Sequence, residues 1–94
     1  MIFKPNIHFT LLVKVEGRLR EFNFRQRTDD SYDADTSDER GNRYLFKWSK
    51  SADGWDIVPI SITMPVWITE SKPSIAAKFD QYMNEANAVQ GKNG

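Results

Sequence analysis

Residues 7–26, IHFTLLVKVEGRLREFNFRQ, contain two runs with apolar residues at every second position, separated by a turn signal. Alternation of this kind is typical of strands that bury one face. The alternating apolar residues are Ile7, Phe9, Leu11, Val13 and Val15 in the first run and Phe22 and Phe24 in the second. Gly17 lies between the runs and supplies the positive φ that a tight turn requires. The stretch therefore predicts an antiparallel hairpin.

The length of the hairpin loop decides which side chains face each other. A two-residue turn places Leu11 opposite Phe22 and Phe9 opposite Phe24, whereas a four-residue loop places Val13 opposite Phe22. Both registers keep the apolar rows on one face, because they differ by an even number of residues. A three-residue loop would set the apolar row against polar side chains, so we reject it.

Three further strands are predicted between residues 32 and 63. Residues 32–37 alternate small or aromatic side chains with acidic ones, and residues 43–50 place Tyr44, Phe46 and Trp48 on one face. A turn over residues 51–54 pairs Trp48 with Ile57. The fifth strand is expected to run from residue 55 to about residue 63. Pro59 has no amide donor, which predicts an edge position or a bulge there.

A C-terminal helix is predicted over residues 72–89, with Ser71 as its N-terminal cap. Its apolar residues recur with the period of a helix that buries one stripe. They are Ile75, Phe79, Tyr82, Met83 and Ala86. Residues 64–68 form either one helical turn or an apolar elbow. The sequence thus predicts an α+β fold, a five-stranded antiparallel β-meander with one C-terminal α-helix packed on one face. We expect one globular domain over residues 1–89 and a disordered tail over residues 90–94.

Composition narrows the compartment and the chemistry. The 94 residues include no cysteine, which excludes disulfides, thiolate metal sites and cysteine nucleophiles. A small secreted domain usually needs such cross-links, so we expect an intracellular, cytoplasmic location. No apolar run approaches the ~20 residues that span a bilayer, so we expect no membrane partner.

The charges are balanced overall but segregated along the chain. Formal net charge is zero, yet residues 1–27 carry six basic and two acidic side chains, while residues 28–42 carry six acidic and one basic. Either the two stretches lie side by side and partly neutralise each other, or each faces a partner of opposite charge. The zero balance itself argues against a nucleic-acid partner.

No residue pattern predicts catalysis, a cofactor or a metal ion. His8 is the only histidine, and no nucleophile or orienting carboxylate stands at a recognisable spacing from it. Residues 33–39 begin like a calcium-binding loop, but Asp38 occupies the position that needs glycine and Tyr44 the position that needs glutamate. We therefore predict a non-enzyme without cofactor, catalytic residues or metal ligands.

The leading hypothesis is a small protein-interaction module that binds a protein partner or itself, as a homodimer. Its candidate contact residues are Trp55, Trp67, Arg18, Arg20, Arg25 and Arg27, because aromatic and arginine side chains dominate binding hot spots. One alternative is a small-ligand pocket between sheet and helix, lined by Phe24, Trp48, Ile57 and Phe79. A second is weak nucleic-acid binding through the arginines of residues 18–27.

Overall fold

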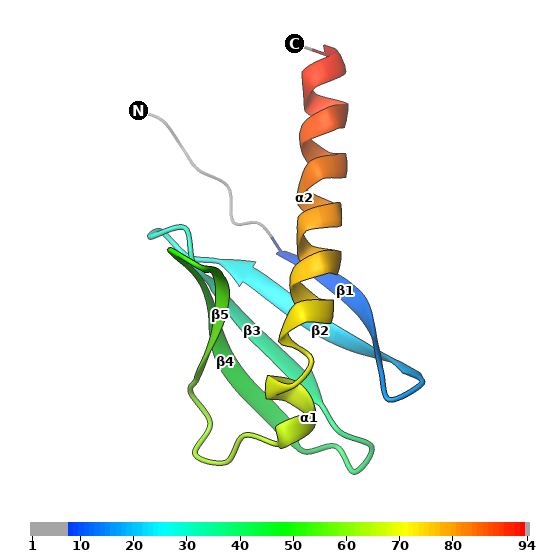
Figure 1. The fold of residues 1–94 in the computed structure, drawn as a ribbon, viewed down its shortest axis with the longest axis vertical. Coiled ribbons are helices and arrows are strands. Elements are labelled where there is room, and N and C mark those ends of the chain that lie inside the picture. Colours follow the sequence, from blue (N-terminus) through cyan, green and yellow to red (C-terminus); the bar gives the residue numbers. More distant parts are fainter. Residues whose placement is uncertain (1–7, 94) are drawn as a thin grey trace.

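Five strands pair in space in the same order in which they follow one another along the chain (Figure 1). A computed structural model describes the backbone of residues 8–93 and the side chains of residues 8–85. The strands are β1 (His8–Val15), β2 (Arg18–Gln26), β3 (Tyr32–Ser37), β4 (Arg43–Ser51) and β5 (Gly54–Pro59). All four pairings are antiparallel, so the predicted five-stranded meander is confirmed.

The β1–β2 hairpin has the shorter of the two predicted loops. Glu16 and Gly17 both have positive φ, 51° and 81°, as a two-residue turn of type I′ requires. Leu11 therefore faces Phe22, and Phe9 faces Phe24. This register places the apolar rows of both strands on the same face of the sheet, where they enter the core.

The β4–β5 pair has the predicted register, with Trp48 opposite Ile57. The prediction for the end of β5 is wrong, because the strand stops at Pro59 instead of continuing to about residue 63. After Pro59 the amides of Ile60 and Ser61 both donate to the carbonyl of Leu45, each at 3.0 Å. Two residues thus share one acceptor, as in a bulge, and regular pairing ends there.

Two helices follow the sheet, α1 (Val66–Thr69) and α2 (Lys72–Asn93). Ser71 stands at the predicted N-cap position of α2, but its side chain does not cap the helix. Its hydroxyl donates to the carbonyl of Trp67 in α1, and only its backbone carbonyl accepts from the amide of Ile75, at 2.9 Å. The helix also continues past Val89 to Asn93. The domain limit predicted at residue 89 stays a prediction.

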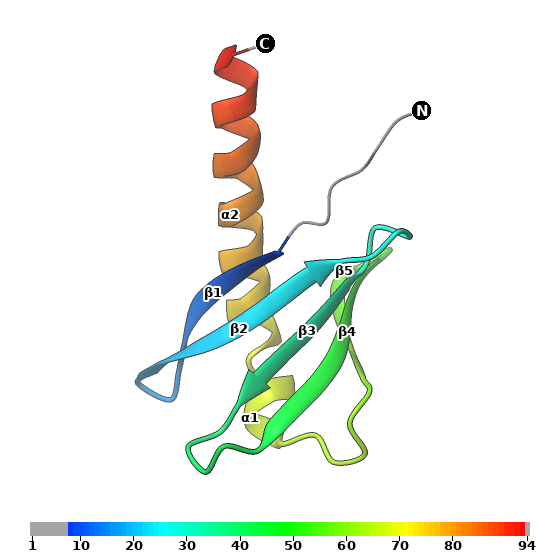
Figure 2. The same cartoon turned by 180° about the vertical axis from the view of Figure 1, so that it is seen from behind.

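Both helices lie on the same face of the sheet (Figures 1 and 2). The core lies between this face and the helices, and its largest fully buried side chains are Trp48, Phe22, Phe24, Phe46 and Phe79. Phe79 contacts one aromatic ring from each of the five strands, with ring centroids 4.6–5.9 Å apart. The opposite face of the sheet, called the outer face below, is not covered by either helix.

Candidate interaction surfaces

The arginines of residues 18–27 lie beside the acidic residues that follow them in the sequence. Arg18 and Arg20 both contact Glu39, the latter at 3.2 Å, and Arg27 contacts Asp33 at 2.8 Å. Arg25 is exposed and stands opposite Asp33 in the β2–β3 register. The basic and acidic stretches therefore lie side by side and partly neutralise each other, as the first of the two interpretations predicted.

Arg20 also packs against a predicted contact residue, Trp67. Its guanidinium carbon lies 4.5 Å from the centre of the Trp67 ring, and its side chain is only 16% exposed. Trp67 meets the rings of Phe22 and Tyr44 edge to face. Arg20 and Trp67 thus close the rim of the core, because a cation above an indole face is attracted to it.

Trp55 lies at the other end of the core. Its ring stacks on Trp48 with a centroid distance of 5.5 Å and an interplanar angle of 4°, and it meets Phe79 at 4.6 Å. Lys50, which stands opposite in the strand register, has its ammonium 6.0 Å from the ring centre. Trp55 is half-buried, so a role in partner binding stays a prediction.

The side chains expected to line a pocket between sheet and helix fill that space themselves. Phe24, Trp48 and Phe79 are buried, and their ring centroids lie 5.5–6.1 Å from one another. Ile57 is half-buried beside them. Rings at these distances are in direct contact, so the packing offers no support for a ligand pocket at this place.

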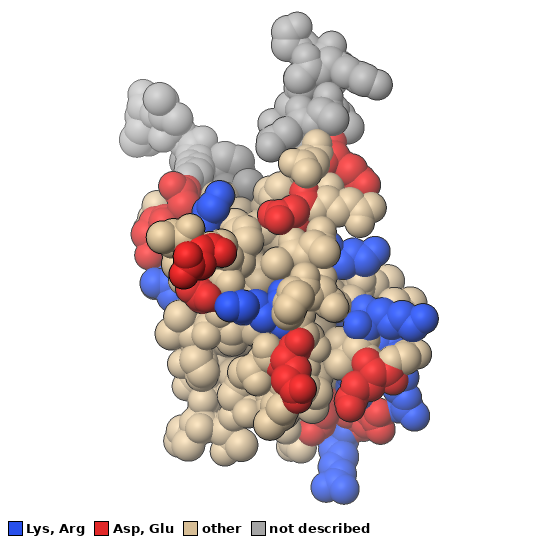
Figure 3. All heavy atoms as spheres, viewed as in Figure 1, with Lys and Arg blue, Asp and Glu red and all other residues tan. Residues whose placement is uncertain are grey.

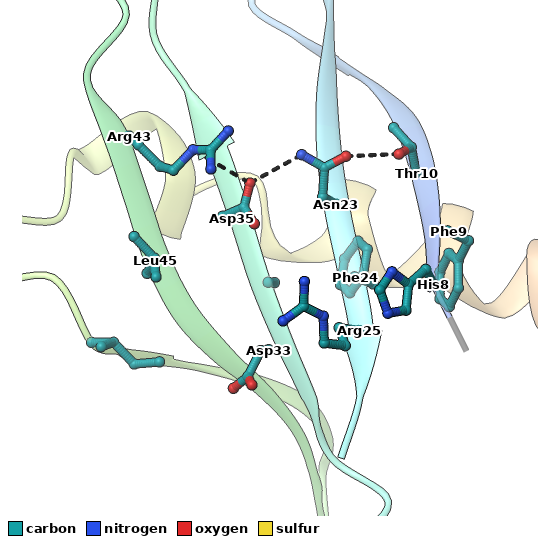
Figure 4. A pocket seen from close by; sticks show the side chains of 12 residues that line it. His8, Phe9, Thr10, Asn23, Phe24, Arg25, Asp33, Asp35, Arg43 and Leu45 are labelled. Atoms are coloured by element: carbon teal, nitrogen blue, oxygen red, sulfur yellow. Dashed lines mark hydrogen bonds and ion pairs between the residues drawn. The ribbon is translucent and has the colours of Figure 1, made fainter. Parts of the chain in front are cut away.

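The outer face of the sheet holds an open hollow of about 750 Å³ (Figure 4). A row of polar side chains crosses its floor over four strands. Thr10 Oγ1 donates to Asn23 Oδ1 at 2.7 Å, Asn23 Nδ2 donates to Asp35 Oδ1 at 3.0 Å, and Arg43 Nε lies 3.9 Å from the same Asp35 oxygen. Two hydrogen bonds and one ion pair thus join the four side chains, so the row acts as a structural ladder between strands.

Two aspartates in the acidic stretch stabilise loops. The Asp38 carboxylate accepts hydrogen bonds from the side-chain amide and from the backbone amide of Asn42, and these bonds lower the pKa of Asp38 to about 2. Asp29 accepts from the hydroxyl and the amide of Ser31, and these bonds likewise lower the pKa of Asp29 to about 2. Within the part of the chain that the structure describes, no group of three acidic or histidine side chains is arranged to hold a metal ion.

An apolar surface follows β5. Residues 57–69 contain no charged side chain. The large exposed side chains of this segment are Val58, Ile60, Ile62 and Val66. Figure 3 shows a broad area without lysine, arginine, aspartate or glutamate over the same part of the molecule, at the lower left. We call these four residues the apolar loop surface.

The free edge of β1 presents backbone groups without partners in the sheet. Residues that flank a two-residue turn bond to each other, so Val15 bonds to Arg18 and the bonded pairs of β1 are its odd-numbered residues. Thr36 Oγ1 donates to the backbone carbonyl of Glu21 at 2.8 Å. This bond agrees with the pattern, because it shows that the backbone carbonyl of Glu21 points towards β3 and away from β1. The even-numbered residues Thr10, Leu12 and Lys14 therefore direct their amides and carbonyls outward. Among the described residues, no hydrogen bond reaches these groups.

The other edge of the sheet is protected. β5 has six residues against eight in β1, and it ends in Pro59. Lys72 of α2 reaches Asp56 on β5, with Nζ and Oδ1 3.1 Å apart. Hydrogen bonds from Ser51 and from Lys72 lower the pKa of Asp56, so this edge stays charged. Short length, proline and charged side chains are common means of protecting an edge strand from pairing. β1 is longer than β5 and contains no proline.

Sequence reasoning placed the candidate contacts on side chains and missed the backbone of β1. The structure brings Arg18 and Arg20 together at Glu39 and places Arg20 on Trp67, whereas Trp55 lies at the far end of the core. A signal for the apolar loop surface was present, namely the charge-free run over residues 57–69. A meander already implies two edges, but the protection of β5 by Lys72 is visible only in the structure.

Within residues 8–93, the fold and these surfaces define a small α+β domain with an open antiparallel sheet, covered on one face by helices and with the edge of β1 left unpaired. No protein-family model, curated protein or solved structure matches the chain. Neither helix within residues 8–93 has the length and hydrophobicity of a transmembrane span.

Proposed function

We propose that the protein is a small, non-enzymatic, cytoplasmic interaction module that self-associates through the free edge of β1. The observation that carries this proposal is the contrast between the two edges of the sheet. The outward amides and carbonyls of Thr10, Leu12 and Lys14 lack partners among the described residues, while proline and an ion pair protect β5. Such an edge is a template for pairing with another strand.

The side chains on this edge also suit a strand partner. Leu12 is 51% exposed on the outer face, at the middle of β1, and Thr10 lies beside it. Both residue types pack well in paired strands. Inward-facing Leu11, Val13 and Val15 are already buried, so the strand has its extended shape before a partner arrives. A preformed strand loses little conformational entropy on binding.

Light scattering coupled to size-exclusion chromatography tests the proposal. We expect the chain to be a dimer at micromolar concentration, and Leu12→Lys to weaken self-association at least about tenfold, or ~1.4 kcal/mol. Two lysines at the middle of a pairing edge repel each other, which is one way in which natural edge strands avoid pairing. Within one chain the new lysine faces Glu21, so the monomer tolerates it.

Leu45→Lys is the matched control. Leu45 is 42% exposed on the same face, and its cross-strand neighbour is also acidic, Asp35, but it lies on the interior strand β4. This variant should remain dimeric. If the parent protein is strictly monomeric, self-association is refuted. If instead Leu45→Lys is monomeric and Leu12→Lys remains dimeric, the contact lies on the outer face and not at the edge of β1.

A further inference from the structure

We infer that two copies pair their β1 strands antiparallel about a two-fold axis at Leu12, which joins two sheets into one of ten strands. This inference rests on the proposed self-association and adds its register. A two-fold axis between antiparallel strands makes the numbers of paired residues sum to a constant. The outward backbone groups belong to even-numbered residues, so even-numbered residues of one copy must pair with even-numbered residues of the other, and the sum must be even. For the middle of the strand this leaves three registers, with the two-fold axis at Leu11, Leu12 or Val13.

The register centred on Leu12 has the best side-chain complementarity. It sets Leu12 against its own copy and Thr10 against Lys14 of the second copy. A register centred on Leu11 opposes Leu12 to Thr10 twice, and one centred on Val13 opposes Leu12 to Lys14 twice. An apolar pair at the centre of the contact stabilises facing strands more than an apolar side chain opposite a polar or charged one. The inward rows also match, because Leu11 then faces Val13 and Phe9 faces Val15.

The position of α2 is compatible with a strand added at this edge. α2 packs against β1 through Phe9, whose ring stacks on Tyr82 with centroids 4.2 Å apart. Beyond this contact the helix backbone projects past β1 on the helix-covered side of the sheet (Figure 2). At 1.5 Å per residue, the part after Met83 is about 15 Å long, or roughly three strand spacings. The helix of one copy can therefore cover the β1 strand of the other.

Disulfide trapping tests the register, since the chain has no cysteine of its own. Hydrogen-bonded antiparallel partners have Cα atoms ~5.5 Å apart, within the ~4.4–6.8 Å that a disulfide spans. We expect Leu12→Cys to cross-link to itself under mild oxidation. Lys14→Cys alone should not cross-link, because its two copies are about 13 Å apart along the strands, but it should cross-link when mixed with Thr10→Cys.

The outcomes separate this register from self-association itself. Leu45→Cys, away from the edge, is the control for random collision and should stay uncross-linked. One result would contradict the register alone: the protein is dimeric by light scattering, Leu12→Cys does not cross-link to itself, and Thr10→Cys cross-links to Leu12→Cys. In that case the two-fold axis lies at Leu11 and the inferred register is wrong. If the protein is monomeric, the proposed function fails and the register fails with it.

Discussion

Replacing Phe79 with alanine is expected to remove about 3–5 kcal/mol from the free energy of unfolding. Phe79 is 1% exposed and touches an aromatic ring from every strand of the sheet. Its loss leaves a cavity that five rings on different strands cannot all close. Small domains have ~5–15 kcal/mol of stability in total, so the variant should unfold at a much lower urea concentration, as followed by tryptophan fluorescence.

Lys78→Ala is the control for the helix itself. Lys78 precedes Phe79 on α2 and is exposed, so this change keeps helix propensity and should alter the free energy of unfolding by less than about 0.5 kcal/mol. A loss below about 1 kcal/mol for Phe79→Ala would mean that α2 does not close the core, and the two-layer architecture would be wrong.

Proline at neighbouring positions of β1 should have opposite consequences for folding and for association. The Val13 amide bonds within the hairpin, so Val13→Pro leaves the Arg20 carbonyl without its partner, at a cost of about 1–3 kcal/mol before any steric strain. The Leu12 amide points outward, so Leu12→Pro spares the hairpin bonds and removes a donor from the free edge. We expect Val13→Pro to be strongly destabilised, and Leu12→Pro to keep nearly the stability of the parent protein and to be monomeric.

Circular dichroism and urea unfolding at a concentration where both variants are monomeric make the comparison, and light scattering at higher concentration reports association. Equal losses of stability in the two variants would show that the Leu12 amide is bonded inside the chain. In that case β1 does not have the free edge from which the function is proposed.

The fold could be predicted because its rows of side chains are local and periodic. The turn signal and the parity of the loop predicted that the apolar rows of β1 and β2 share one face, but they left two registers open, and the structure has the one with Leu11 opposite Phe22. The turn over residues 51–54 predicted Trp48 opposite Ile57, as observed. The end of β5 could not be predicted, because it depends on two amides that share the Leu45 carbonyl. The Ser71 side chain was misassigned because α1, which supplies its acceptor at Trp67, is a single turn with a weak sequence signal.

The candidate site was harder to predict because it depends on contacts between distant residues. Sequence reasoning named Arg20 and Trp67 as separate candidate contact residues, and in the structure they stack on each other across the rim of the core. Glu39, which pairs with Arg18 and Arg20, follows them by about twenty residues and belongs to the neighbouring turn. The protection of β5 by Lys72 similarly joins residues from different elements.

Residue-resolved amide hydrogen exchange at low and high protein concentration tests the central claim, the pairing of β1 edges, most directly. Amides that exchange through an open edge become protected when a second strand bonds to them. We predict that the amides of Leu12 and Lys14 exchange more slowly as concentration rises, while those of β5 and residues 60–66 do not change. Concentration-dependent protection confined to β5 or the apolar loop surface, or none anywhere, would contradict the account.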